Sequence, residues 1–253
     1  MNPKYLLETS SLGLSYGAFT AVGNVDLKIK KGTIHTVIGP NGAGKTSLFH
    51  CLTGERTPSR GVVLFDGQNI TNLPPHKRVS KGMSRSFQVT SLFQELSVLE
   101  NLRIAAQGRD GLKALKFWVR ETANDSHLKK AREVLEKIKL ESVAEKLAGE
   151  LSHGQQRILE VGMSLCGSPE LLLLDEPTSG MGVDDIPTMT HLISELGRDH
   201  TVMLIEHNMR LVMSISDRIT VMHQGNILLE GTPDQIKGDK RVKKAYLGES
   251  GNE

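Results

Sequence analysis

The chain has 253 residues, of which 38% are hydrophobic and 24% are charged, and its formal net charge is +2 at pH 7. This length allows one sizeable domain, or a core with a subdomain inserted into it, and the near balance of charges gives no general attraction to a polyanionic partner. Aromatic residues make up only 4% of the chain, which argues against a surface that stacks single-stranded bases.

The amino terminus, MNPKYLLETS, has no long apolar stretch, so no signal peptide is expected. The longest apolar run, Leu171–Leu174, is much shorter than the roughly 20 residues that span a bilayer. Cys51 and Cys166 lie in apolar runs without metal-like companions, which fits a reducing compartment. If the protein serves a membrane process, we expect it to act from the cytoplasmic side through another chain.

Short strands and turns are predicted for the first part of the chain. A β-rich run leads into a glycine-rich loop, and a helical pattern follows that loop, which together predict a strand–loop–helix unit. In chain order, the predicted elements are strands at 4–8 and 25–29, a turn at 30–32, a strand at 33–38, a helix at 46–52 and a strand at 62–65.

The middle of the chain, from Ser97 to Leu151, has a helical period and few strand signals. Leu128, Ala131, Leu135 and Ile138 fall on one helical face, and charged residues occupy the other. A solvated helix face explains these charges better than a nucleic-acid patch. We therefore expect a helical insertion here.

An alternation of strands and helices returns after Leu151. The continuous apolar runs Leu171–Leu174 and Thr201–Ile205 are typical of buried parallel strands. Arg218–Glu230 has the pattern of a hairpin with its turn at Gln224-Gly225-Asn226, and Lys237–Tyr246 that of a basic helix. The sequence thus predicts two α/β segments around the helical insertion.

Polar or glycine residues end three of the predicted strands. These ends are Ile38-Gly39, Leu174-Asp175 and Ile205-Glu206-His207. Ligands of open α/β sheets bind at the carboxyl ends of the strands, so these segments are expected to form one site.

The glycine-rich loop matches the phosphate-binding pattern G-x-x-x-x-G-K-[ST], known as the P-loop. Its glycines allow backbone N–H groups to turn toward an anion, and the following helix adds its positive end. Lys45 is placed to reach the β- and γ-phosphates of a nucleotide, and the Thr46 hydroxyl to bind Mg²⁺. The alternative, a chance glycine-rich turn, is disfavoured by the strand before the loop and the helix after it. The expected nucleotide contacts are Gly39, Pro40, Asn41, Gly42, Ala43, Gly44, Lys45, Thr46 and Ser47.

Two acidic residues follow the run of four leucines. A buried strand would deliver Asp175 to the Mg²⁺ ion, and Glu176 would polarise the attacking water. The alternative is that acidic residues merely end a strand.

The segment Leu151-Ser152-His153-Gly154-Gln155 precedes a helical run. Ser152 and Gln155 have capping-box spacing, which needs no functional explanation. Ser152 and the Gly154 amide at a helix start would equally form a corner that binds phosphate. The residues alone leave both interpretations open.

In series, the P-loop, the LSHGQ segment and LLLLDEPTSG resemble the ATP-binding-cassette (ABC) ATPases over nearly the whole chain. The resemblance implies a RecA-like α/β P-loop core (1–88 and 156–253), with an antiparallel β-subdomain at its amino terminus and an inserted α-helical subdomain (89–155). It also implies that ATP and Mg²⁺ are bound and that ATP is hydrolysed, with Glu176, His207, Lys45 and Gln88 as the catalytic residues.

The same resemblance assigns further contacts. Ser152, Gly154 and Gln155 would close over the ATP held by a second ATPase subunit. Gln88 would contact Mg²⁺ or water, and His207 would touch the γ-phosphate, unless it is an ordinary histidine at a strand end. Tyr16 would stack on adenine, and its alternative role is that of a core tyrosine. The expected Mg²⁺ ligands are Thr46, Gln88 and Asp175.

Two positions depart from the family pattern. His153 stands where glycine is more usual, although the neighbouring Ser152 and Gly154 are intact. Gly182 stands where many relatives have an aspartate, so the residue used for communication across the dimer is not at its usual place.

Within the family, LSHGQQ, Leu159-Glu-Val-Gly-Met and Leu204-Ile-Glu-His-Asn-Met are similar to the ATPase subunits of branched-chain amino acid importers and of the related urea or short-amide importers. This implies a peripheral protein on the cytoplasmic face of the inner membrane. Its expected partners are a second, identical or different ATPase subunit, membrane permease subunits and an extracytoplasmic solute-binding protein, with no nucleic acid. An ATPase for lipid or polysaccharide export would carry the same motifs, and an ABC ATPase acting on nucleic acid or ribosomes is a more distant alternative.

Overall fold

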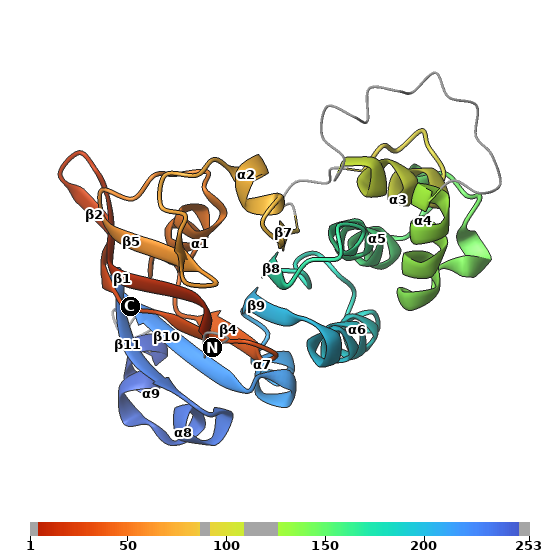
Figure 1. The fold of residues 1–253 in the computed structure, drawn as a ribbon. Coiled ribbons are helices and arrows are strands. Elements are labelled where there is room, and N and C mark those ends of the chain that lie inside the picture. The colour runs from red at the N-terminus through yellow and green to blue at the C-terminus, as the bar shows by residue number, and fades with distance from the viewer. Residues whose placement is uncertain (1–4, 87–91, 109–125, 248–253) are drawn as a thin grey trace. The chain divides into compact units, whose positions relative to one another are not determined.

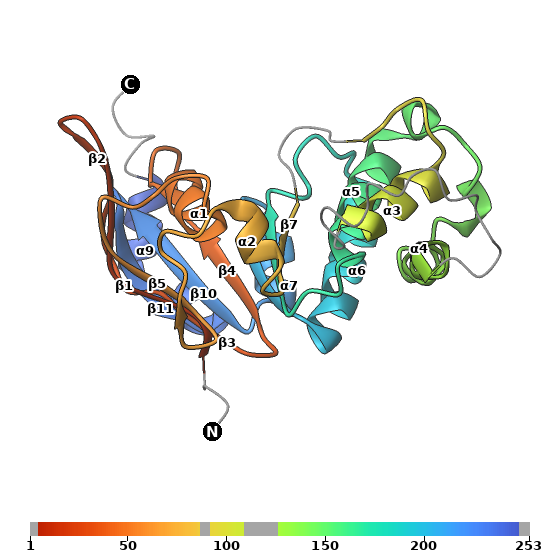
Figure 2. The ribbon, with the colours of Figure 1, turned by 45° about the horizontal axis from the view of Figure 1, so that its top comes forward.

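The computed structural model describes residues 5–86, 92–108 and 126–247. It divides into two compact units, the first formed by residues 1–78 and 193–253 and the second by residues 79–192. Figures 1 and 2 show the elements of both units.

The first unit contains two sheets. The first sheet is mainly antiparallel and has the strand order β2-β1-β5-β6, with β3 also paired to β1. Its strands are β1 (Tyr5–Tyr16), β2 (Phe19–Val25), β3 (Lys28–Lys30), β5 (Arg60–Phe65) and β6 (Gln68–Asn69).

The second sheet of this unit forms its α/β core. Its strands lie in the order β11-β10-β4-β9, with β10, β4 and β9 parallel and β11 antiparallel at the edge. These strands are β4 (Ile34–Ile38), β9 (Thr201–Ile205), β10 (Arg218–His223) and β11 (Asn226–Gly231). Every residue of β4 and β9 is buried, as the apolar run Thr201–Ile205 predicts for β9.

Helices cover both sheets of the first unit. They are α1 (Lys45–Thr53), α7 (Met209–Ile215), α8 (Pro233–Gly238) and α9 (Lys240–Leu247). Helix α1 contacts β1 and β2, and both α8 and α9 contact β11 (Figure 1). The two boundaries between the units fall within helices α2 (Pro75–Val79) and α6 (Ile186–Asp199).

The second unit is largely helical. Helices α3, α4 and α5 pack against one another, and α5 also contacts the parallel pair of strands β7 and β8 (Figure 1). Its elements are β7 (Met83–Arg85), α3 (Val98–Gln107), α4 (Ser126–Lys137), α5 (His153–Leu165), β8 (Leu171–Asp175) and two short 3₁₀ helices, Glu141–Val143 and Ala148–Glu150. On the predicted helical face, Ala131 and Leu135 of α4 and Ile138 just after it are at most 5% exposed, and Leu128 is half-buried.

Two predictions of local structure were wrong. The strand expected at 25–29 is interrupted, because the Thr9 side chain bonds the Val25 carbonyl and the Leu27 amide and the chain turns between β2 and β3. The helix expected at Lys237–Tyr246 is two helices, because Asp239 lies between them and its carboxylate accepts a hydrogen bond from the Arg241 amide.

No helix in the described ranges has the length and apolar character needed to cross a membrane.

Candidate functional site

The P-loop joins β4 to α1 in the first unit, as the strand–loop–helix pattern predicts. A Cβ atom at Gly39 would collide with the Met222 carbonyl oxygen, and one at Gly44 with the Ala21 carbonyl oxygen. Gly44 also has a φ of 97°, in the left-handed region that favours glycine. The backbone therefore requires glycine at both ends of the loop.

Lys45 lies inside the loop rather than in solvent. It is 6% exposed, and its Nζ donates hydrogen bonds to the carbonyl oxygens of Gly39 (2.8 Å) and Pro40 (3.1 Å). Thr46, the next residue, is exposed. The Lys45 ammonium group belongs to the first residue of α1, so its charge adds to the positive end of the helix dipole. Both favour the binding of a phosphate group here.

Helix α1 is held at its other end by Arg78. The Arg78 guanidinium donates from Nη1 to the carbonyl oxygens of Cys51 (2.8 Å) and Leu52 (2.7 Å), which belong to the last turn of α1. Arg78 is 2% exposed, and burial lowers its pKa to about 10. Because the guanidinium satisfies terminal carbonyls of the helix, it fixes the element that follows the P-loop.

The end of β9 lies beside the end of β4, because Val37 pairs with Ile205 in the parallel ladder. Glu206 follows and is 2% exposed, and its Oε2 accepts hydrogen bonds from the amides of His207 (2.8 Å) and Asn208 (3.0 Å). This turn leaves His207 exposed at the same edge of the sheet as the P-loop.

Tyr16 is the last residue of β1 and is 46% exposed, which excludes the alternative of a core tyrosine. Its role in stacking on adenine stays a prediction. Gln88 lies outside the described residues.

The two acidic candidates lie in the second unit, at the end of β8. Asp175 is 5% exposed, and its amide donates a hydrogen bond to the Ser86 hydroxyl at 3.3 Å. Glu176 is half-buried and has a φ of 49°, a left-handed conformation that is uncommon for glutamate. Strained backbone of this kind concentrates at functional sites, which supports a special role for position 176.

The LSHGQ segment begins helix α5, also in the second unit. The Gln155 amide donates to the Ser152 hydroxyl (3.2 Å) and the Ser152 amide to Gln155 Oε1 (3.2 Å), so the capping box is confirmed. Gly154 is buried, and a Cβ atom there would collide with the Asp185 carboxylate. Phosphate binding by Ser152 and Gly154 stays a prediction.

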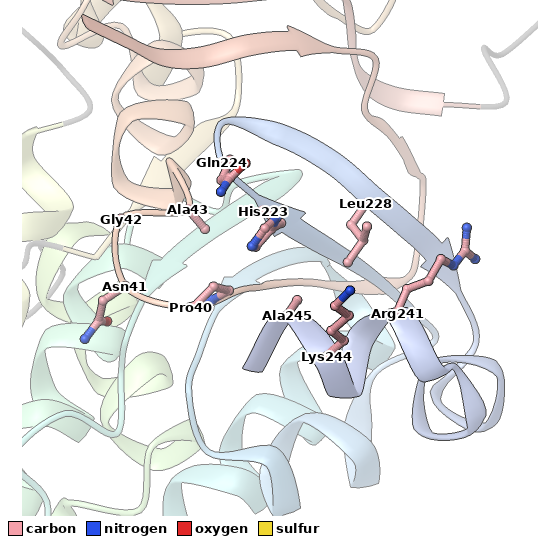
Figure 3. A pocket seen from close by; sticks show the side chains of 10 residues that line it. All are labelled: Pro40, Asn41, Gly42, Ala43, His223, Gln224, Leu228, Arg241, Lys244 and Ala245. Carbon is pink, nitrogen blue, oxygen red and sulfur yellow. The ribbon is translucent and has the colours of Figure 1, made fainter. Parts of the chain in front are cut away.

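The structure brings residues to the P-loop that no sequence pattern had connected with it. The Gly225 amide donates to the Ala43 carbonyl oxygen at 3.0 Å, and Tyr246 of α9 packs against the buried apolar cluster that contains Ile38, the last residue before the loop. A pocket of about 480 Å³ is lined by residues of the loop on one side and by residues of α9 on another (Figure 3). The pocket is lined by Pro40, Asn41, Gly42, Ala43, His223, Gln224, Leu228, Arg241, Lys244 and Ala245.

Comparison with known proteins defines the class. Residues 22–179 match the model of the ABC transporter family. The chain therefore belongs to the ATP-binding-cassette transporter family, as one of its ATP-hydrolysing subunits. The resemblance seen in the motifs and the predicted fold class are thereby confirmed.

Within this family, the chain is similar to individual proteins over nearly their whole length. The chain is 41% identical to the "High-affinity branched-chain amino acid transport ATP-binding protein BraF" of Pseudomonas aeruginosa, over 97% of this chain and 98% of that protein. It is also 41% identical, over the same shares of both chains, to the corresponding protein LivG of Escherichia coli K12. Residues 226–252 match a second model, described as a branched-chain amino acid ATP-binding cassette transporter.

A solved structure supports the fold. The ADP conformation of an ATP-binding cassette of an ABC transporter superposes on this chain with a TM-score of 0.86 and is 31% identical to it. The match covers 97% of this chain and 100% of that chain.

Proposed function

We propose that this chain hydrolyses ATP to drive the import of branched-chain amino acids through a membrane permease. The observation that carries the catalytic part is the P-loop, whose glycines are required by the backbone and whose Lys45 lies inside the loop. The cargo is inferred from BraF and LivG, which match the chain over nearly their whole length and are named for branched-chain amino acid transport.

In this proposal the loop amides and Lys45 bind the β- and γ-phosphates of ATP. Tyr16 stacks on the adenine, and His207 contacts the γ-phosphate from the edge of the sheet. Glu176 positions the attacking water, because phosphoryl transfer depends mainly on positioning and on electrostatic stabilisation. Gln88, between the core and the helical subdomain in the sequence, contacts Mg²⁺ or water and couples the site to the partner.

The proposed Mg²⁺ ligands are Thr46, Gln88 and Asp175. Their hydroxyl, amide and carboxylate oxygens are the hard donors that Mg²⁺ prefers, so the donor set fits the ion. When bound, Mg²⁺ would neutralise charge on the phosphate oxygens.

We further propose that a second ATPase subunit completes the site with its Ser152, Gly154 and Gln155. This is supported by the position of Ser152 and Gly154 at the start of α5, where backbone amides and the positive helix end favour a phosphate. The second subunit is a copy of this chain or a related one. Permease subunits and an extracytoplasmic solute-binding protein would complete a transporter on whose cytoplasmic face the chain lies.

The proposed subdomains are a catalytic core (1–88 and 156–253) and a helical subdomain (89–155). The compact, largely helical second unit, residues 79–192, supports an insertion of this kind. Closure of the ATP-bound pair would move the helical subdomain and the permease that it contacts.

The test compares a strain that lacks this gene with the same strain carrying the wild-type gene or Glu176→Gln. Uptake of radiolabelled leucine should fall in the deletion strain, return with the wild-type gene and stay low with Glu176→Gln. Uptake of urea serves as the control cargo. Leucine, isoleucine and valine uptake equal in all three strains would refute the cargo, and a purified wild-type complex without ATP hydrolysis would refute the catalytic part.

A further inference from the structure

Another pocket of the first unit is lined by residues of helices α7, α8 and α9. Its volume is about 480 Å³, within the range of pockets that hold small molecules. None of its lining residues is proposed to bind ATP or Mg²⁺, so this pocket is separate from the proposed catalytic site. The lining residues are Met209, Met213, Ile236, Lys237, Val242, Lys243 and Tyr246.

Most of the lining of this pocket is apolar. Ile236 of α8 and Val242 of α9 are at most 6% exposed and belong to a buried apolar cluster of the first unit. The two methionines of α7, Met209 and Met213, are half-buried and pack against the same cluster. Methionine side chains are unbranched and adaptable, so they suit contact with a flexible hydrocarbon chain. The interior therefore favours an aliphatic group over a polar one.

Two lysines are the charged residues among those that line the pocket. Lys237 of α8 and Lys243 of α9 are both exposed, and no ion pair joins either of them to a described residue. Asp239, which lies between the two helices, is not part of the lining, and its carboxylate accepts a hydrogen bond from Arg241 Nη2 at 2.8 Å. The pocket thus combines an apolar interior with two positive charges.

These charges and the apolar lining together define a class of ligand. A hydrocarbon chain is stabilised by burial in the interior, and a carboxylate at its end would meet the lysine ammonium groups. A zwitterion such as leucine would place its own ammonium beside the same lysines, and the lining offers it no carboxylate. The pocket is therefore complementary to an aliphatic chain that carries a single negative charge.

Helix α9 is itself basic and amphipathic, a pattern that also occurs in helices that lie on anionic membranes. Its apolar face is already covered, because Val242 and Ala245 are only 6% and 8% exposed within the first unit. These side chains are not available to enter a bilayer, whereas the pocket is a recess that one hydrocarbon chain can enter. The fold thus favours a free ligand over a membrane surface.

We propose that this pocket binds a free aliphatic carboxylate, such as a fatty acid of medium chain length. Its chain would lie among Met209, Met213 and Ile236, and its carboxylate would contact Lys237 and Lys243. Such a ligand is neither the nucleotide nor the proposed cargo. Its binding does not depend on ATP, so it is measured without nucleotide and is independent of the proposed function.

Calorimetric titration of the full chain with octanoate tests the proposal, and octanol is the neutral ligand of the same chain length. Octanoate should bind about 3- to 10-fold more tightly than octanol, a modest factor because exposed charge pairs are individually weak. Added salt should reduce this difference. From hexanoate to octanoate, each added methylene should tighten binding by at most about fourfold. Leucine should not compete with octanoate.

Three variants locate the ligand. The double variant Lys237→Gln, Lys243→Gln should bind octanoate as weakly as octanol, while its affinity for octanol stays that of the wild type. Lys240→Gln is the matched control, because Lys240 is an exposed lysine of α9 outside the pocket lining, and it should bind octanoate normally. Met213→Trp fills the interior and should lose binding of both ligands. The lysine variants change only exposed side chains, so the test does not depend on the folding of Met213→Trp.

Four outcomes would overturn the proposal. They are the absence of octanoate binding to the wild-type chain, equal octanoate affinity in the wild type and the double lysine variant, and wild-type affinity in folded Met213→Trp, which would place the ligand elsewhere. The fourth is binding to vesicles of phosphatidylglycerol without binding of free octanoate, which would make α9 a membrane contact instead.

Discussion

The ammonium group of Lys45 and the carbonyl oxygen of Gly39 are 2.8 Å apart, so the lysine closes the P-loop on itself through a hydrogen bond. Both residues are buried, and the same ammonium also donates to Pro40. Lys45 thus has a structural task in this conformation in addition to its proposed contact with phosphate.

Replacing Lys45 by Met should weaken ATP binding. The methionine keeps an unbranched buried side chain and loses the ammonium, so the affinity for ATP should fall at least about tenfold, as expected for a charge-assisted hydrogen bond. Titration calorimetry measures this affinity. Thr46→Val is the matched control, since it should preserve binding without Mg²⁺ and lose the gain in affinity that Mg²⁺ gives. Equal ATP affinity in Lys45→Met and the wild type would contradict the proposed contact.

The two interpretations of Ser152 can be tested against each other. Ser152→Ala removes the N-cap of α5 and should lower the free energy of unfolding by about 1 kcal/mol. Ser152→Asp keeps a good N-cap and adds a negative charge where a phosphate is proposed to bind. It should unfold like the wild type in denaturant and lose ATPase activity in the assembled transporter. Normal activity of Ser152→Asp would leave capping as the only role of this residue.

The stability of the chain should depend on His35 in acid. His35 is 1% exposed and its Nε2 lies 2.8 Å from the Thr220 hydroxyl. Burial lowers its pKa from 6.5 to about 4, with a smaller opposing effect of Glu230 and a further lowering by Arg218. Between these two pH values the unfolded chain binds more protons, so the contribution of His35 is present above pH 6.5 and is lost as the pH falls to about 4.

His35→Gln, which does not titrate, isolates this contribution. Urea unfolding at pH 6.5 and near pH 4 should show a smaller loss of stability in the variant than in the wild type, by at most about 3 kcal/mol. The comparison between the two proteins removes the effect of the carboxylates that titrate in both. An identical loss in the two would show that His35 is protonated in the folded chain at an ordinary pKa.

Arg78 should be among the most sensitive positions for stability. Besides its bonds to α1, its Nε donates to the Leu73 carbonyl oxygen and its Nη2 to that of Thr71, both at 2.9 Å. Arg78→Met leaves these carbonyl oxygens without the guanidinium and should cost about 3 kcal/mol or more in the free energy of unfolding. Arg198→Met is the control, because the Arg198 side chain is 71% exposed and its loss should cost at most about 0.5 kcal/mol.

Strands with a recognisable local sequence pattern, such as a run of apolar residues or a hairpin turn, were predicted well. Thr201–Ile205 coincides with β9, and the hairpin predicted at Arg218–Glu230 is formed by β10 and β11. In contrast, β1 extends to Tyr16 through a segment rich in serine and glycine, because it pairs with β2, the next strand, and with β5, which is distant in sequence. Such pairing leaves no local pattern in the sequence.

The same distinction applies to the candidate site. The P-loop and the capping box are local patterns, since a few consecutive residues define their backbone geometry. The contacts of Arg78 with α1, of Tyr246 with the cluster that contains Ile38, and of Asp185 with Gly154 join segments that are brought together only by folding. They depend on tertiary packing, and the sequence offered no spacing from which to infer them.

The contact between Gly154 and Asp185 makes these two positions epistatic. Since the Asp185 carboxylate occupies the space that a methyl group at 154 would need, alanine at 154 can be accommodated only together with a smaller or displaced side chain at 185. A library that varies the LSHGQ segment alone would therefore score Gly154 as intolerant to substitution for a steric reason. Varying both codons at once would separate this steric demand from any requirement imposed by nucleotide.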